Sequence, residues 1–245
     1  MAHGTPDWGL TAGTITTYQL TDLAELAARL GSIVTFDRRG EVLFLDDFAD
    51  GLVHWSWETD GAGASVDLSA ARARIGRFSA RLVGGSDGWR YAEIFRSLSP
   101  HAPSNCGFEV AFNYDDDLTF IRLTLIVYDG ATRAEFGVIW YNTSKELLYT
   151  GFEGDDVLLA AGIDLNRGPT PFHTAKLVTN VPNGEYIRFL LDNAEYSLAG
   201  IPGLSEASAL APDIELVVAV QSKPGVNGAA YIDAVIATQN EPVCA

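Results

Sequence analysis

The sequence predicts an all-β protein: an antiparallel jelly-roll β-sandwich that carries a short N-terminal arm and one short helix. From residue 41 onwards, apolar and polar side chains alternate with a period of two in one segment after another. Turn signals such as Asp129-Gly130 and Asn183-Gly184 separate these segments. Many short strands at regular spacing with almost no helix are typical of sandwiches and jelly rolls. A chain of 245 residues suits one large domain of this class, residues 41–245, preceded by residues 1–40.

The first forty residues hold the predicted arm, the helix and the first hairpin strand. Residues 1–20 are irregular and rich in Gly and Thr, whereas residues 21–31 (TDLAELAARLG) have an apolar stripe at helical spacing. Asp22 can cap this helix, and Glu25 completes a capping box. A helix this short is marginal alone, so we expect it to dock on another surface. A hairpin around Arg38-Arg39-Gly40 leads into the sandwich.

The rest of the chain is predicted to form strands. In residues 119–128, one face is purely apolar (positions 121, 123, 125 and 127), and the other carries Phe120, Arg122 and Tyr128. In residues 185–191, Tyr186 and Arg188 are expected on the face away from the core. Residues 199–212 read as a long connection. The predicted strands are residues 53–58, 64–68, 78–83, 90–97, 107–114, 119–128, 132–141, 146–151, 172–181, 185–191, 214–222 and 229–237.

The charge balance excludes two classes of partner. The 32 acidic residues outnumber the 16 basic ones, which gives a formal net charge of −16. Nucleic acid and anionic membranes are therefore not expected as partners, because phosphate neutralisation needs clustered Lys and Arg. The two cysteines, Cys106 and Cys244, are too few for a disulfide framework, and they are either one tether or two unpaired thiols.

Three segments carry a resemblance to a known family. Residues 46–57 (DDFADGLVHWSW) resemble the first strand of carbohydrate-binding-module-like jelly rolls, residues 74–82 (RIGRFSARL) are similar to their second strand, and residues 231–235 (YIDAV) to their last. Concanavalin-like and laminin-G-like sandwiches share this pattern. The resemblance implies a structural Ca²⁺ between Asp47 and Asp233. Ala49 stands where the family has a glutamate ligand, and the alternative is that these aspartates cap turns.

Aromatic and arginine side chains on the strands make a second candidate site. Trp55 and Trp57 share one strand face, and Trp89 and Tyr91 share another; with Trp140 and Tyr141 they are expected to be exposed. A flat aromatic ring stacks on the apolar face of a sugar, and an arginine can donate hydrogen bonds to it. The alternative is that at least half of these rings pack in the core. The candidate ligand-binding residues are Trp55, Trp57, Trp89, Tyr91, Arg122 and Arg188.

Catalytic patterns are absent from the sequence. It contains no Glu-x-Asp-x-Glu strand motif, no His-Glu-x-x-His, no Gly-x-Ser-x-Gly and no phosphate-binding glycine loop, and its four histidines are scattered. We therefore predict a protein that is not an enzyme. A glycoside hydrolase or lyase on the same fold is the weakest alternative.

Two functions remain. The first is a structural or assembly protein of a virion, a capsid decoration or tail component of a bacteriophage, which its N-terminal arm anchors to protein partners or to further copies of itself. The N-terminus lacks the basic and apolar regions of a secretory signal, so we expect synthesis in the cytoplasm and incorporation into a virion or other particle. The alternative is a carbohydrate-binding module that recognises a glycan on an aromatic-lined sheet face.

Overall fold

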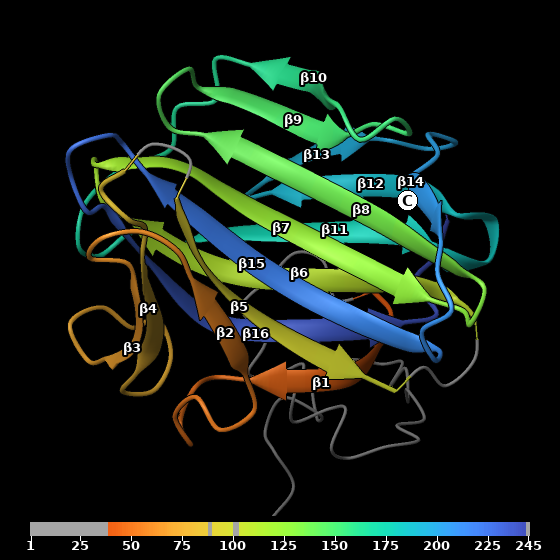
Figure 1. Ribbon diagram of the computed structural model, residues 1–245, viewed down its shortest axis with the longest axis horizontal. Coiled ribbons are helices and arrows are strands. Elements are labelled where there is room, and N and C mark those ends of the chain that lie inside the picture. The colour runs from red at the N-terminus through yellow and green to blue at the C-terminus, as the bar shows by residue number, and fades with distance from the viewer. Residues whose placement is uncertain (1–38, 88–89, 100–102, 244–245) are drawn as a thin grey trace, which may run out of the picture.

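Two antiparallel β-sheets packed face to face confirm the predicted sandwich (Figure 1). The computed structural model describes residues 39–87, 90–99 and 103–243. The predicted arm and helix, Trp89 and Cys244 lie outside the described residues. Within them, a single 3₁₀ turn (η2, Val181–Asn183) stands among the strands, and no helix is long and apolar enough to cross a membrane.

Each sheet contains eight strands. Sheet A follows the order β13 (Ala194–Ser197), β12 (Glu185–Leu191), β11 (His173–Asn180), β6 (Asn105–Tyr114), β16 (Ala229–Gln239), β4 (Ser79–Val83) and β3 (Ser65–Ser69), with β1 (Glu41–Asp46) also paired to β16. Sheet B follows the order β10 (Asp156–Ala161), β9 (Glu146–Thr150), β8 (Thr132–Tyr141), β7 (Leu118–Tyr128), β15 (Asp213–Ser222), β5 (Tyr91–Leu98) and β2 (Ser56–Thr59), with β14 (Leu204–Ala207) paired to β8.

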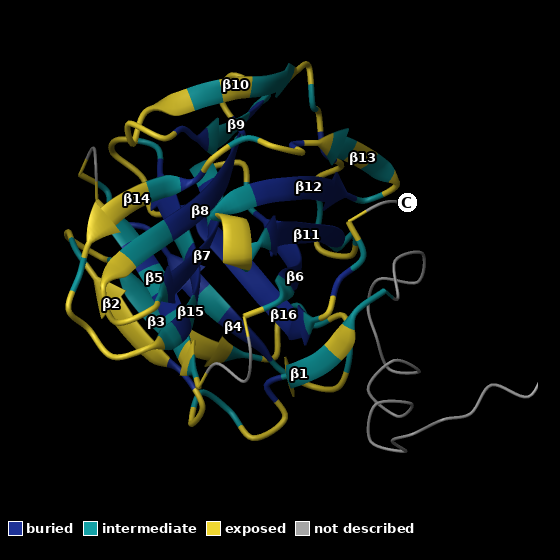
Figure 2. Cartoon of the chain, turned by 90° about the vertical axis from the view of Figure 1, so that its right-hand side faces the viewer, coloured by how far each residue is buried: buried dark blue, intermediate teal, exposed yellow. Residues whose placement is uncertain are grey.

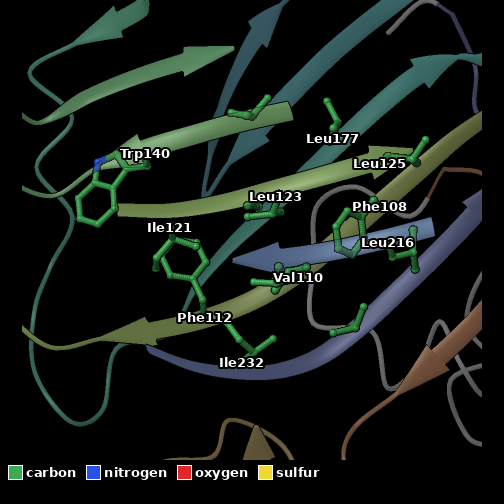
Figure 3. Packing of buried hydrophobic residues seen from close by; sticks show 14 of the residues in the cluster. Phe108, Val110, Phe112, Ile121, Leu123, Leu125, Trp140, Leu177, Leu216 and Ile232 are labelled. Atoms are coloured by element: carbon green, nitrogen blue, oxygen red, sulfur yellow. The ribbon is translucent and has the colours of Figure 1, made fainter. Parts of the chain in front are cut away.

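The core fills the space between the sheets, as expected from the alternation. Residues 121, 123, 125 and 127 of β7 all belong to the buried cluster, opposite side chains of β6 such as Phe108 and Phe112 (Figure 3). The polar side chains of β7 consequently point away from the core, onto the outer face of sheet B. Here the sequence pattern predicted both faces of a strand correctly.

All twelve strands predicted from residue 53 onwards are present, and β1 is the strand expected after Gly40, but three short ones were not predicted. They are β10, β13 and β14, and the segment 199–212 is therefore not a plain connection. Their sequences (DVLLAA, AEYS and LSEA) lack a long alternation, and they take part in the sheets through pairing with β9, β12 and β8. They lie at the margins of the sandwich, where much of their surface is exposed (Figure 2).

The hairpin between β11 and β12 has the predicted turn but an unexpected bulge. The Asn180 side chain accepts a hydrogen bond from the backbone of Asn183, and Gly184 closes the turn at φ 66°. The register then shifts by one residue, so Tyr186 faces the core and not the outer surface. Its hydroxyl donates to the Thr150 carbonyl at 2.9 Å and accepts from the Gly137 amide at 2.8 Å. Tyr186 thus connects the two sheets.

Candidate binding groove

The outer face of sheet B is hollowed into a groove of about 510 Å³. Strands β5, β15, β7 and β8 supply most of its lining, through the side chains that alternate with the core residues. The volume lies within the range of roughly 300–1,000 Å³ that is usual for ligand clefts. Strands from distant parts of the sequence form this surface, because β15 is inserted between β5 and β7.

One row of side chains across the groove is mainly aromatic. Tyr91, Gln221, Phe120 and Tyr141 follow one another in register on β5, β15, β7 and β8; we call them the aromatic row. The rings of Phe120 and Tyr141 pack edge to face with their centroids 5.5 Å apart. Gln221 is only 8% exposed and lines the groove. Its side-chain amide offers a donor and an acceptor to a polar ligand.

The neighbouring row places charges on either side of a small residue. Glu93, Ala219 and Arg122 are in register on β5, β15 and β7. Because Ala219 carries only a methyl group, it forms a low floor between the carboxylate and the guanidinium. A Cβ atom at Gly137, on β8, would lie 3.2 Å from Nη2 of Arg122, so the glycine leaves room for this side chain.

Arg122 is held by a polar network. Its Nη2 donates to Glu135 Oε1 at 2.8 Å and to Thr150 Oγ1 at 3.1 Å, whereas its buried Nε has no partner. Arg133 donates to the second carboxylate oxygen of Glu135. The carboxylate of Glu135 therefore pairs with both arginines of the groove. These hydrogen bonds fix the orientation of Arg122 before a ligand binds.

Glu93 is one of three carboxyls in the groove whose pKa is raised. Burial raises its pKa, the nearby charges of Glu58 and Glu215 raise it further, and Arg122 opposes them. Burial likewise raises the pKa of Tyr91, whose hydroxyl is hydrogen-bonded to Glu58. Glu58 lies directly opposite Glu93 in the pairing of β2 with β5. Two like charges at facing positions of a sheet destabilise the fold.

We therefore expect Glu93→Gln to stabilise the protein at neutral pH. A carboxyl with a raised pKa binds its proton more tightly in the folded state, so the free energy of unfolding falls as the pH rises from the ordinary value through the raised one. Glu93→Gln does not lose stability in this way as the pH rises. Its extra stability should vanish in acid, where Glu93 of the unmodified protein is protonated in both the folded and the unfolded state. Urea unfolding at several pH values checks this. Asp67→Asn, at an exposed site on β3, is the control; equal pH profiles for all three proteins would contradict the expectation.

The structure places some of the residues proposed from sequence in the groove and others elsewhere. Tyr91 and Arg122 lie in the groove, and so does Tyr141. Trp55 and Trp57 share a face, as predicted, but it is the core side of β2. There Trp55 is 5% exposed and stacks on Phe48, whereas Trp57, at the edge of the sheet, is 54% exposed.

The expected exposure of Trp55, Trp140 and Arg188 is therefore wrong. Trp140 is buried against Tyr114 in the core. Arg188 points outward from sheet A as predicted, but Glu241 and the Pro242 carbonyl cover it with hydrogen bonds of 2.9 and 2.7 Å. Sequence reasoning missed Glu93, Ala219 and Gln221, although β5 and β15 were both predicted as strands.

The predicted cation ligands contain one feature that fits a metal ion. Asp233 is fully buried; its Oδ2 accepts the backbone amides of Arg74 and Ile75, and its Oδ1 has no partner. The charge of Asp47 is close enough to raise the pKa of Asp233, after the larger effect of burial. The described residues contain no cluster of three or more acidic, His or Cys side chains around a common point, so backbone carbonyls would have to complete the coordination.

Comparisons with known proteins agree on the fold. No protein-family model matches the chain, and the curated proteins contain no matching sequence. Among solved structures, the cellulose-induced protein Cip1 is 16% identical, with a TM-score of 0.55 over 82% of this chain and 100% of its own. An endo-β-1,4-glucuronan lyase from the fungus Trichoderma reesei is 13% identical, with a TM-score of 0.55 over 81% and 95%. Both structures therefore share the antiparallel β-sandwich fold of this chain.

Proposed function

We propose that the groove of sheet B binds a glycan chain without cleaving it. The observation that carries the proposal is the aromatic row beside Arg122: a flat apolar surface next to fixed hydrogen-bonding groups suits a sugar ring, which has an apolar face and a polar edge. The side-chain amide of Gln221 in the groove lining adds a further donor and acceptor. The glucuronan lyase acts on a polysaccharide, and its shared fold supports this class of ligand.

Alanine substitutions in the aromatic row test the proposal. We expect Tyr91→Ala and Tyr141→Ala each to weaken binding of a recognised glycan about fivefold, which corresponds to about 1 kcal/mol for one lost aromatic contact. A glycan array would find the ligand, and isothermal titration calorimetry would measure its affinity. Trp57→Ala removes an exposed aromatic residue outside the groove and should leave the affinity unchanged. The opposite pattern would move the binding site to the edge of β2.

Catalysis in the same groove is the alternative function, and the observation that most favours it is the raised pKa of Glu93. A half-buried carboxyl with a raised pKa is a suitable general acid for glycoside cleavage. Incubation of the recognised glycan with the protein, followed by assays for new reducing ends and unsaturated products, separates the two. We expect no product. If the unmodified protein forms a product and Glu93→Gln does not, the groove is catalytic and the proposal of binding without cleavage is wrong.

We further propose that a Ca²⁺ ion binds at Asp233 and Asp47. The buried Oδ1 of Asp233 supports the proposal, because a buried carboxylate oxygen without a hydrogen-bond partner is costly. A ligand at a hundred times its Kd stabilises the fold by about 2.7 kcal/mol, so the melting temperature should be several degrees higher in CaCl₂ than in chelator. Asp233→Asn should remove this difference, whereas Asp67→Asn should keep it. Identical melting curves of the unmodified protein in both solutions would exclude the ion.

Attachment to a virion or another particle through the N-terminal residues remains a separate proposal. It is supported by the sequence signals in residues 1–40, and it is compatible with glycan binding because the groove belongs to the sandwich. Removal of residues 1–31 should abolish self-assembly or particle binding, as measured by light scattering and co-sedimentation. A truncated protein that assembles normally would refute this role.

A further inference from the structure

The charges of the groove are unevenly compensated. Its lining contains the acidic residues Glu93, Glu135, Asp156 and Glu215 but only two basic residues, Arg122 and Arg133. Both arginines form ion pairs with Glu135, and Arg133 reaches Glu206 as well. The charges of both arginines are thus already paired with the carboxylates of Glu135 and Glu206, and Glu135 is itself almost buried.

Four carboxylates in or beside the groove form no ion pair among the described residues. Glu58 and Glu93 face each other across β2 and β5, Glu215 lies on β15 between β5 and β7, and Asp156 lies on β10. Burial raises the pKa of Glu215, as it does that of Glu93. Each therefore weakens the folded state when ionised. A cation placed among them would relieve both the desolvation and the mutual repulsion.

We propose that the glycan bound by this groove carries ammonium groups, as a glucosamine polymer of the chitosan class does. The inference rests on the proposed glycan binding and names its substrate class. The aromatic row takes the apolar faces of the sugar rings, and the amino groups lie towards Glu93, Glu58 and Glu215. A polyuronate is disfavoured, because its carboxylates would meet the unpaired acids while the charges of both arginines are already paired with Glu135 and Glu206.

Three β-1,4-linked hexamers test this directly: glucosamine, N-acetylglucosamine and glucuronate. The first two share a backbone, and acetylation converts each ammonium group into a neutral acetamide. Calorimetry at pH 6 and low ionic strength should give the glucosamine hexamer at least a tenfold tighter Kd than its acetylated form. Added salt should narrow this difference, because the carboxylates remain accessible to ions. The glucuronate hexamer should bind more weakly than either.

Variants separate the groove from the overall negative charge of the protein. Glu93→Gln and Glu215→Gln should each weaken binding of the glucosamine hexamer about fivefold, the loss of one exposed ion pair, and should weaken binding of the acetylated hexamer by a clearly smaller factor. Asp67→Asn changes the net charge equally on sheet A and should have no effect. An equal loss in Asp67→Asn would reduce the effect to bulk attraction and overturn the inference.

Two further outcomes separate the amino-sugar assignment from the proposed glycan binding on which it rests. If the acetylated or glucuronate hexamer binds as tightly as the glucosamine hexamer and Tyr91→Ala weakens that binding, the groove binds glycans but the amino-sugar assignment is wrong. If no hexamer binds and the glycan array shows no ligand whose affinity depends on Tyr91, the proposed function itself is wrong.

Discussion

Replacement of Glu241 by alanine is expected to destabilise the fold by about 3–5 kcal/mol, the usual cost of removing one partner from a buried ion pair. Glu241 is fully buried after the end of β16, where Oε1 lies 2.7 Å from Nζ of Lys176 and Oε2 lies 2.9 Å from Nη2 of Arg188. The hydroxyl of Thr238 also donates to Oε1 at 2.6 Å. Without the carboxylate, two buried cations and a hydroxyl lose an acceptor that water cannot easily replace.

Urea unfolding and thermal melting measure this effect, and the melting temperature should fall by roughly 10 °C for a domain of this size. Glu241→Gln keeps the volume of the side chain and one acceptor oxygen, so its free energy of unfolding should lie between those of the unmodified protein and of Glu241→Ala. Gln239→Ala, two residues earlier and at the end of β16, should change the free energy of unfolding by less than about 0.5 kcal/mol. A cost below about 1 kcal/mol for Glu241→Ala would mean that the chain around the network relaxes and lets water reach the two cations.

Glu241 also explains why one sequence prediction about the site was incomplete. Alternation in residues 185–191 placed Arg188 on the outer face of sheet A, and it is there. Its burial depends on Glu241, which is 53 residues further along the chain, so no pattern within β12 could indicate that the arginine is covered. The same reasoning applies to Trp55: its shared face with Trp57 was predictable, but the contact of its Nε1 with Asp46 at 3.0 Å was not.

The groove shows the same division between local and non-local information. The alternation of residues 119–128 predicted that Arg122 leaves the core, because a strand's two faces are set by a period of two. The residues beside Arg122 depend on strand order. Glu93 and Ala219 come next to it only because β15 pairs with both β5 and β7, and two antiparallel registers must be known to see the row. Ala219 has no chemical signal of its own in the sequence.

That small residue provides the most direct test of the groove. Ala219→Tyr is expected to remove most of the glycan binding with little change in stability. The phenol would fill the floor between Glu93 and Arg122, while the position faces away from the core and tyrosine is favourable in a strand. Overpacking by a large side chain costs about 1–3 kcal/mol, which corresponds to a loss of affinity of roughly 5- to 150-fold when the ligand bears it.

Leu68→Tyr on β3 is the matched control, because it adds the same ring at a half-exposed position of the other sheet. Both variants should unfold at urea concentrations close to that of the unmodified protein, and only Ala219→Tyr should lose affinity in calorimetry. Because Ala219 contributes no charge, no hydrogen-bonding side chain and no ring, its effect cannot come from a lost contact. Full affinity in a folded Ala219→Tyr protein would therefore place the glycan elsewhere on the sandwich, whatever the polar variants show.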